Sequence, residues 1–314
     1  MENKTVRPSV RVSHPATTLS QNPDIILAGA TGYLGSHLVV KLLEQGYHFR
    51  AIARNVKKLQ EMGLEKKQII KAEVTRAGSL RDKLQEAEVL ISTVGITRQK
   101  DGLTYMDVDY QANMNLLEEA KRVGIKKFIY ISAVNGDKMR HLKIMEAKEK
   151  FVDALITSGM NYTIIRPNGF FSDLKDFLEM AKSGRVYLFG DGNYKLNPIH
   201  GADLAKMILE HISGAEKEIE VGGPDILTQN EIAALALKAL NKSVKIAHLP
   251  DWIRRGTIKA LRTLTSSRTY GPYEFFLSMM AQDNIAPHYG IYRLKTFFRE
   301  EVDAIHPEKE KQNY

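Results

Sequence analysis

Three glycines spaced three residues apart stand near the start of the chain, between an apolar run and an amphipathic stretch. Gly29, Gly32 and Gly35 follow the run at 24–28 and open the stretch at 33–46. The first glycine permits a sharp turn out of a strand, the second lets the backbone approach a pyrophosphate, and the third lets a helix pack closely on a sheet. Main-chain N–H groups at the helix start attract phosphate charge. A glycine-rich turn without a ligand is the alternative, and the strand–turn–helix context favours a dinucleotide site.

The second apolar run ends in a cation where NAD sites usually carry an acid. That acid bonds the adenosine ribose 2′-OH of NAD, whereas an arginine accommodates the extra phosphate of NADP. Arg54 ends the run at 48–54, and Lys57 and Lys58 follow it. A guanidinium can bind phosphate through two parallel hydrogen bonds. We therefore expect NADP(H), held by Arg54 and Lys58, although a solvated helix start explains the two lysines equally well.

Seven short apolar runs alternate with amphipathic stretches. Leu34, Leu38 and Leu42 recur every fourth residue and so share one helix face. Gly46 and Gly124 stand where a helix ends in a left-handed residue. Strand–helix alternation indicates right-handed βαβ units, so we predict an α/β fold with a Rossmann-like, doubly wound parallel sheet. The seven runs are 24–29, 48–54, 68–74, 88–94, 127–132, 161–167 and 218–223.

The alternation weakens after about residue 166, which suggests a division of the chain into three parts. We predict a flexible N-terminal arm over residues 1–22 and an NAD(P)-binding domain over 23–245. A small, mainly helical C-terminal lobe and tail cover 246–314, and we expect this lobe to close over the carboxyl edge of the sheet. Within it, residues 252–264 form a basic amphipathic helix that can pack on its own domain or lie on a membrane surface. We favour packing.

Two further strand ends should line the same crevice, because ligands of open α/β sheets bind outside the carboxyl ends of the strands. The third run ends at Val74, which we expect near the adenine. The fourth run leads into Thr93, Val94 and Gly95, which we expect to face the middle of the cofactor. The small residues among them permit the cofactor to approach the backbone closely.

The composition excludes several classes of protein. The 314 residues carry a formal net charge of +8 and no cysteine, which excludes disulfides, thiolate metal sites and a cysteine nucleophile. No apolar run reaches the roughly 20 residues that cross a bilayer, and residues 1–22 lack the apolar segment of a secretory signal. The positive charge favours anionic partners, but no nucleic-acid-binding motif stands out. We expect a cytoplasmic protein without nucleic-acid or metal partners, and the sequence leaves its oligomeric state open.

Seven segments in order resemble the atypical short-chain dehydrogenase/reductase family, and within it the NmrA-like and isoflavone-reductase-like proteins. They read "GATGYLG", "RAIARN", "ISTVG", "KFIYISA", "YTIIRP", "NPIHGADLA" and "EVGGPDILT". The resemblance implies a fold and a nucleotide site for roughly residues 24–245. It assigns a pyrophosphate loop, a 2′-phosphate arginine, a contact from the fourth strand, a ribose lysine and a far wall of the nicotinamide pocket. The implied pyrophosphate loop consists of Gly29, Thr31, Gly32, Tyr33, Leu34 and Gly35, and the implied 2′-phosphate arginine is Arg54. Thr93 and Val94 would make the contact from the fourth strand, and Lys148 would hold the nicotinamide ribose. The far wall of the nicotinamide pocket would be formed by Pro167, Asn168 and Phe170.

The proton donor of ordinary short-chain dehydrogenases is missing. Those enzymes place a tyrosine four residues before the lysine, as the acid that protonates a carbonyl. Here Ile144 stands four residues before Lys148, and no tyrosine of the chain has a lysine four residues later. Ser132 lies near the usual serine position. Ordinary keto-reduction and nucleotide-sugar epimerase or dehydratase chemistry are therefore not expected.

Two roles remain open for Lys148. The isoflavone-reductase-like resemblance implies a lysine as general acid/base, which requires burial or a nearby cation to lower its pKa. Otherwise Lys148 contacts the ribose only. The leading interpretation is an NADPH-dependent oxidoreductase of a small hydrophobic or quinone-like substrate. The alternative is a non-catalytic NADP(H)-binding redox sensor or assembly factor. His200 and Asp203 are expected to position a helix start rather than to catalyse.

Overall fold

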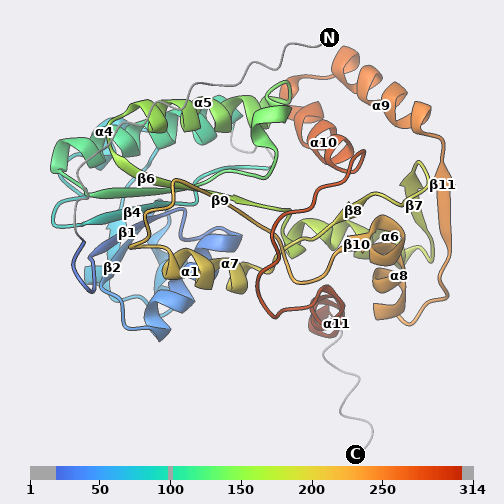
Figure 1. Ribbon diagram of the computed structural model, residues 1–314, viewed down its shortest axis with the longest axis horizontal. Helices are drawn as coiled ribbons and strands as arrows, with labels where there is room; N and C mark the ends of the chain where they lie inside the picture. Colours follow the sequence, from blue (N-terminus) through green and yellow to red (C-terminus); the bar gives the residue numbers. More distant parts are fainter. Residues whose placement is uncertain (1–18, 98–101, 306–314) are drawn as a thin grey trace, which may run out of the picture.

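Seven parallel strands form the central sheet (Figure 1). The computed structural model describes residues 19–97 and 102–305, so residues 1–18 of the predicted arm and 306–314 of the predicted tail lie outside the described residues. Each predicted apolar run contributes one strand, which confirms the Rossmann-like α/β fold. In spatial order the strands are β3 (Ile69–Lys71), β2 (Phe49–Ala53), β1 (Ile25–Ala28), β4 (Val89–Ser92), β5 (Lys127–Ile131), β6 (Asn161–Pro167) and β9 (Glu218–Val221).

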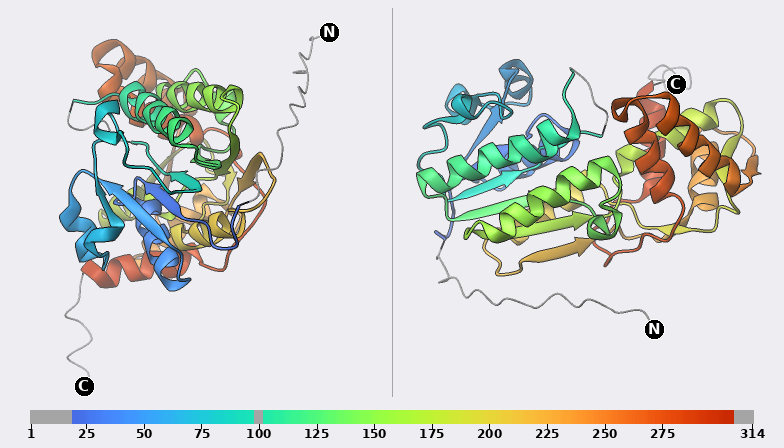
Figure 2. Two further views of the ribbon diagram at one scale, coloured as in Figure 1. Left: turned by 90° about the vertical axis from the view of Figure 1, so that its left-hand side faces the viewer. Right: turned by 90° about the horizontal axis from the view of Figure 1, so that it is seen from above.

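Helices cover both faces of this sheet (Figure 2). Ile25 and Leu27 of β1 belong to the core on one face, and Ile26 and Ala28 belong to the core on the other. Strands buried on both faces read as continuous apolar runs, which is why they stand out in the sequence. The first face carries α1 (Tyr33–Glu44), α2 (Val56–Glu61) and α7 (Gly201–Glu210), and the second carries α3 (Ala77–Leu80), α4 (Asn113–Val123) and α5 (Lys143–Thr157).

The local signals of α1 and α4 are confirmed. Leu34, Leu38 and Leu42 are buried together in the core beneath α1. Gly46 has a φ of +68° after α1, and Gly124 caps α4 with a φ of +79°. Both helices therefore end where a residue without a Cβ can turn the chain in the left-handed region.

A smaller lobe follows the carboxyl ends of β6 and β9. Its core joins residues of α6, β7, α8 and α11. The lobe is mainly helical and includes residues from 171 onward that the sequence-based prediction assigns to the nucleotide domain; its helices are η4 (Phe171–Leu174), α6 (Lys175–Lys182), α8 (Gln229–Ala239), α9 (Asp251–Leu264), α10 (Ser267–Met279) and α11 (Leu294–Ile305). It also holds two small sheets, made of β7 (Val186–Phe189) with β11 (Ile246–Leu249) and of β8 (Lys195–Leu196) with β10 (Leu227–Thr228). These four strands are missing from the prediction; β8 and β10 have only two residues each, too few to show a pattern.

Buried amides connect the lobe to the sheet. The side chain of Asn168, just after β6, donates to Asn197 Oδ1 at 2.8 Å and to the carbonyl of Asn284 at 2.5 Å. Asp203 of α7 accepts the main-chain N–H groups of Ile291 and Tyr292, each at 3.0 Å. The segment between α10 and α11 therefore runs back against the sheet domain.

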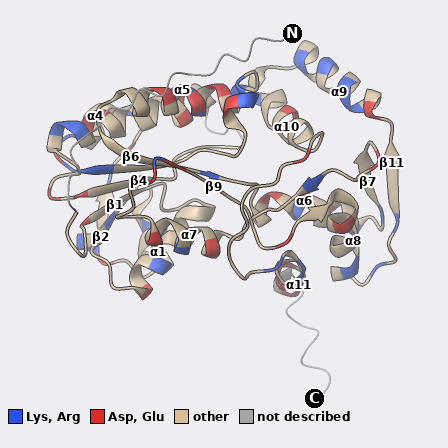
Figure 3. Ribbon diagram, in the orientation of Figure 1, with Lys and Arg blue, Asp and Glu red and all other residues tan. Residues whose placement is uncertain are grey.

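The α9–α10 hairpin lies on the outer side of the lobe, and Lys and Arg residues recur along α9 (Figure 3). α10 lies between α9 and the sheet domain, because it contacts both α9 and α5. Among the described helices, none combines the length and apolar composition that crossing a membrane requires.

Candidate functional site

The turn between β1 and α1 is built around contacts that leave no room for side chains. Gly29 has a φ of +84°, and a Cβ there would lie 2.5 Å from Thr93 Oγ1. A Cβ on Gly35 would lie 2.1 Å from the carbonyl oxygen of Gly29. Gly32 is less constrained, since its nearest neighbour would be the same oxygen at 3.3 Å. The outer glycines therefore fix the turn, and the middle one leaves its outer surface open to a ligand.

The start of α1 provides the anion site that the glycine spacing predicts. Gly32 is the N-cap and contributes no capping side chain, and the first turn carries no acidic residue. The first N–H groups of a helix have no partner within the helix, and the helix dipole places partial positive charge there. This is the cradle that a pyrophosphate requires.

Lys58 approaches this cradle and Lys57 does not. Lys58 Nζ donates to the carbonyl of Thr31, inside the glycine loop, at 2.5 Å. Lys57 is 80% exposed, and its Nζ lies 3.8 Å from Glu61 Oε1 on its own helix. Lys57 therefore fits the alternative interpretation, in which it is a solvated residue at the start of a helix and not a phosphate ligand.

Arg54 lies directly after β2 beside an acid that the prediction missed. Its Nε is 3.6 Å from Glu73 Oε2, and the Arg54 side chain is 60% exposed. Glu73 stands inside the third apolar run, but its closeness to Arg54 depends on the pairing of β2 with β3. Glu73 also accepts from Thr75 and so stays anchored to its own loop. The guanidinium lies at the end of β2, where the resemblance places the 2′-phosphate of NADP.

The end of β4 meets the glycine turn at the point where the strand order reverses. The Thr93 main-chain N–H and hydroxyl both donate to the carbonyl of Ala28, at 3.0 and 3.1 Å. Buried Asn113 donates to the carbonyl of Val94 and accepts from the Ser92 hydroxyl. The predicted residues from Thr93 to Gly95 are thus fixed next to the glycine turn, where ligands of such folds bind.

Lys148 points into a buried pair with Asp109. The distance from Lys148 Nζ to Asp109 Oδ1 is 2.9 Å, and neither side chain is more than 13% exposed. Asp109 belongs to η2 (Met106–Ala112), a π-helical turn, which is a feature often found at functional sites. A Cβ on Gly95 would lie 2.6 Å from Asp109 Oδ1 and 2.8 Å from Lys148 Nζ. Three residues distant in sequence therefore form one unit at the end of β4.

A general acid/base role for Lys148 requires a lowered pKa, and the charges of this pair do not provide it. Burial is the largest influence and lowers the pKa of Lys148, but Asp109, Tyr130 and Glu149 together outweigh burial and the pKa is raised. Burial also raises the pKa of Asp109, and the Lys148 ammonium opposes that shift. Because the N–O separation is that of a charged pair, we take Lys148 as an ammonium facing a carboxylate. The condition for a general acid/base role, a lowered pKa of Lys148, is therefore not met, and the ribose contact remains the other role open to this lysine.

A tyrosine does approach Lys148, but from β5. Lys148 Nζ lies 5.8 Å from the centroid of the Tyr130 ring. Tyr130 is fully buried against Phe151, and burial raises its pKa. Its hydroxyl is enclosed in the core, so Tyr130 does not replace the missing proton donor.

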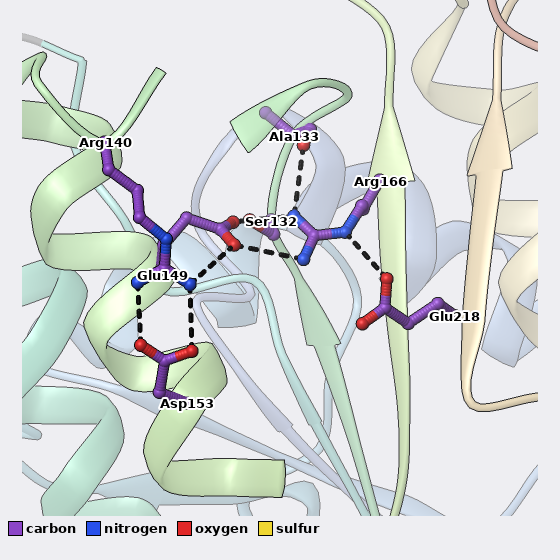
Figure 4. A network of polar contacts seen from close by, with 7 residues as sticks. All are labelled: Ser132, Ala133, Arg140, Glu149, Asp153, Arg166 and Glu218. Carbon is purple, nitrogen blue, oxygen red and sulfur yellow. Dashed lines mark hydrogen bonds and ion pairs between the residues drawn. The ribbon is translucent and has the colours of Figure 1, made fainter. Parts of the chain in front are cut away.

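Ser132 belongs to a network of buried charges (Figure 4). Its hydroxyl donates to Glu149 Oε1 at 2.7 Å, and Arg166 Nη1 donates to the same oxygen at 2.6 Å. Arg140 Nη2 lies 3.7 Å from the other Glu149 oxygen. Glu149 of α5, which the prediction missed, is fully buried and pairs with groups from three places: just after β5, on β6, and in the segment before α5. Ser132 thus has a protein partner in place of a ligand-facing role.

The residues expected to form the far wall of the nicotinamide pocket lie in different surroundings. Asn168 is 2% exposed, and its side chain faces Asn197 and Asn284 rather than a crevice. The Pro167 carbonyl accepts from Val134. Phe170 is half-buried with its ring 5.6 Å from that of Tyr33, so it lies beside the glycine loop. Val74 is half-buried after β3, and its carbonyl accepts from Asn115.

Aromatic rings connect the glycine loop to α7 and the lobe. The Tyr33 hydroxyl accepts from the Gly201 N–H at 3.1 Å, and burial raises the pKa of Tyr33 to about 12. The His37 ring lies 5.0 Å from the His200 ring, which stacks on Tyr292 at 4.3 Å. His200 also caps α7, as predicted, by accepting from Ala202. Burial, and then the neighbouring His200, lower the pKa of His37 to about 4.

The site fits a nicotinamide dinucleotide. The glycine turn leaves backbone exposed, cations stand at the end of β2, and the end of β4 is closed by small residues. A sequence model of the NAD(P)H-binding family matches residues 29–214, which is more than half of the chain. The chain therefore belongs to the NAD(P)H-binding family. Its membership confirms the predicted cofactor class and the NAD(P)-binding, Rossmann-type domain.

Curated relatives carry two different names. The chain is 28% identical over 331 residues to the chloroplastic divinyl chlorophyllide a 8-vinyl-reductase of Oryza sativa subsp. indica, covering 93% of this chain and 82% of the relative. It is 27% identical over 233 residues to the photosystem II assembly factor Ycf39 of Guillardia theta, covering 72% and 73% of the two chains. The predicted cytoplasmic location stays a prediction.

A solved isoflavone reductase has the same fold. The TM-score is 0.67 at 17% identity, and the similarity covers 90% of this chain and all of the other. The fold that the resemblance to isoflavone-reductase-like proteins implies is thereby confirmed.

Gly29→Ala is expected to lower NADPH affinity about tenfold or more, because the new Cβ would displace the β4 end from the phosphate turn. Gly46→Ala is the matched control. Gly46 also has a positive φ but has open space around it, so it should lose only about 1–2 kcal/mol of stability to backbone strain and keep its NADPH affinity. Calorimetric titration and chemical unfolding measure both quantities. Equal losses of affinity in the two variants would contradict the role of Gly29.

The pKa of His37 makes stability depend on pH. The unfolded chain binds a proton at this ring near pH 6.5 and the folded chain only near pH 4. The neutral His37 ring therefore makes its full contribution to the free energy of unfolding above pH 6.5, and this contribution is lost as the pH falls towards 4. His37→Gln should reduce the fall in unfolding free energy over this interval by about 1–2 kcal/mol, since the ring is only partly shielded from solvent. His141→Gln, at an exposed position, should leave the fall unchanged.

Proposed function

We propose that the protein is an NADPH-dependent reductase of a conjugated, hydrophobic substrate. The observation that carries this proposal is the Lys148 ammonium held beside Gly95, next to the glycine turn, with no tyrosine acid in the usual position. When bound, NADPH supplies a hydride. The groups around Lys148 decide which acceptors can use it.

The first part of the mechanism is positioning. N–H groups at the start of α1 bind the pyrophosphate, and Arg54 and Lys58 hold the 2′-phosphate. The Lys148 ammonium donates hydrogen bonds to the nicotinamide ribose while Asp109 fixes its position. These contacts orient one face of the nicotinamide towards the lobe. Orientation of this kind supplies much of the rate of a bimolecular step.

The absent tyrosine favours reduction of a conjugated double bond over reduction of a ketone. A ketone needs an acid at its oxygen as hydride arrives. In a conjugated carbon–carbon double bond, hydride adds to one carbon, the charge spreads through the conjugated system, and a proton then reaches the other carbon from solvent. The relatives named vinyl-reductases support this chemistry, so a vinyl-bearing tetrapyrrole is the first substrate to test. Quinones and enones, which are also conjugated, come next.

A non-catalytic role has its own supporting observation. The raised pKa of Lys148 and its pairing with Asp109 suit a nucleotide-binding lysine that transfers no proton. The Guillardia theta relative is named an assembly factor. Under this second proposal, NADP(H) binding stabilises or switches a protein that assists assembly of a partner.

The preference for NADP(H) depends on Arg54. Arg54→Ala should weaken NADPH binding about 10- to 100-fold through loss of a charge-assisted pair, and should leave NADH binding within about twofold. Lys57→Ala is the control, because Lys57 points to Glu61 on its own helix. Fluorescence titration of both nucleotides against the three proteins gives the comparison. Equal affinity of the parent protein for NADH and NADPH would remove the assignment.

The catalytic proposal is tested by NADPH oxidation with divinyl chlorophyllide a, quinones and enones. Lys148→Ala should lower turnover about 100-fold while the protein still binds NADPH. Lys150→Ala is the control, because this exposed lysine lies on the same helix against the Tyr110 ring. A parent protein that binds NADPH but turns over no member of the panel would favour the assembly role.

A further inference from the structure

Helix α9 is only shallowly packed on the rest of the molecule. None of its residues is buried. Trp252 at its start is 66% exposed and Leu264 at its end is 81% exposed. Large apolar side chains are usually covered in a protein that meets only water. Both ends of α9 therefore present apolar groups to the surroundings.

The outer face of α9 combines this tryptophan with cations. Trp252, Arg255 and Lys259 follow at spacings of three and four residues, so they line one side of the helix. All three are exposed, whereas Ile253 and Leu261 on the other side are half-buried. The outward side is thus basic with an aromatic anchor, and the apolar side is held by the lobe.

Positive charge is concentrated in this part of the chain. Residues 242–274 contain seven Lys or Arg residues and two acids, in a chain whose formal net charge is +8. Arg255, Lys259 and Arg262 line a depression on α9 together with Ile258 and Thr263, and the basic residues along α9 are visible in Figure 3. Lys259 has no acidic partner among the described residues. Arg255 pairs with Asp251 and Arg262 pairs with Glu274, so Lys259 is the cation of this depression that is best able to bind an anionic group.

The hairpin is rigid enough to present this face as a unit. Arg262 of α9 pairs with the buried carboxylate of Glu274 on α10. Phe275 and Met279 of α10 pack on the cluster that includes Met145 of α5. The same helix α5 carries Lys148 three residues later. The exposed face of α9 is thus fixed relative to the Lys148 side of the site.

We propose that the outer face of α9 docks on the surface of an anionic lipid bilayer. Phosphate headgroups would bind around Lys259, beside Arg255, while Trp252 enters the boundary between headgroups and acyl chains at the start of the helix. A tryptophan suits this boundary because its ring is apolar and its N–H polar. An acidic protein is the competing occupant. The bilayer fits better, because an exposed tryptophan and cations along one side of an open helix match a flat surface that is anionic outside and apolar within.

α10 lies between α9 and α5, so docking through the outer face of α9 would leave α10 between the bilayer and the helix that carries Lys148. The docking itself does not depend on catalysis, so its test does not depend on the proposed function.

Trp252 is the only tryptophan of the chain, so its fluorescence reports on this face alone. The full chain is mixed with vesicles of phosphatidylcholine and phosphatidylglycerol in equal parts, or of phosphatidylcholine alone. With the anionic vesicles we expect a blue shift of the emission and quenching by brominated acyl chains, both lost in high salt. An unshifted emission with the anionic vesicles would overturn the proposal. Binding to polyglutamate but not to vesicles would overturn it in favour of an acidic protein partner.

Two charge-reversal variants distinguish docking through α9 from non-specific attraction between the net charge of the protein and the vesicles. Each cation near an anionic surface strengthens binding about fivefold, so Lys259→Glu should lower the vesicle partition coefficient about 25-fold. Lys66→Glu makes the same change at an exposed position next to β3 and should change it less than about twofold. Unaltered circular dichroism and NADPH affinity show that both variants are folded. Equal weakening by the two reversals would refute docking through α9.

Discussion

The contact between the glycine turn and the end of β4 is the constraint on which the site depends. Gly29 and Thr93 approach so closely that no side chain fits between them, and Gly35 allows α1 to start directly on the same turn. This contact sets the direction of α1, and α1 packs on α7. α7 in turn carries Asp203, which binds the segment returning from the lobe. A backbone contact of a few ångströms thus fixes both the phosphate cradle and the attachment of the second lobe.

Two adjacent residues of α5 show how buried charge positions the functional lysine. Lys148 is paired with Asp109 beneath Gly95, and Glu149 is paired with Arg166 between β5 and β6. A buried ion pair contributes little net stability, because desolvation opposes the attraction, but breaking one is costly. The two pairs therefore act mainly as restraints. They hold α5 against rotation, so the Lys148 ammonium keeps its place at the end of β4.

The lobe adds what the nucleotide domain lacks. Its buried amides attach it to the end of β6, and Tyr292 stacks on His200, whose ring in turn contacts Tyr33 of the glycine loop. On its outer side the same lobe carries a basic helix with an exposed tryptophan. In our proposals the nucleotide binds at the sheet edge, and contact with a membrane surface is made by the lobe.

The sequence alone determined the parallel sheet, the phosphate turn and the cation at Arg54, because these follow from short-range patterns. Strands buried on both faces are continuous apolar runs, and the glycines of the turn stand within seven residues of one another. Only the tertiary structure decided the state of Lys148 and the partner of Ser132. Asp109 lies 39 residues before Lys148, and Glu149 lies 17 residues after Ser132. Partners that meet only when strands and helices are assembled leave no signal in the local pattern, and their charges set the pKa of the lysine they enclose.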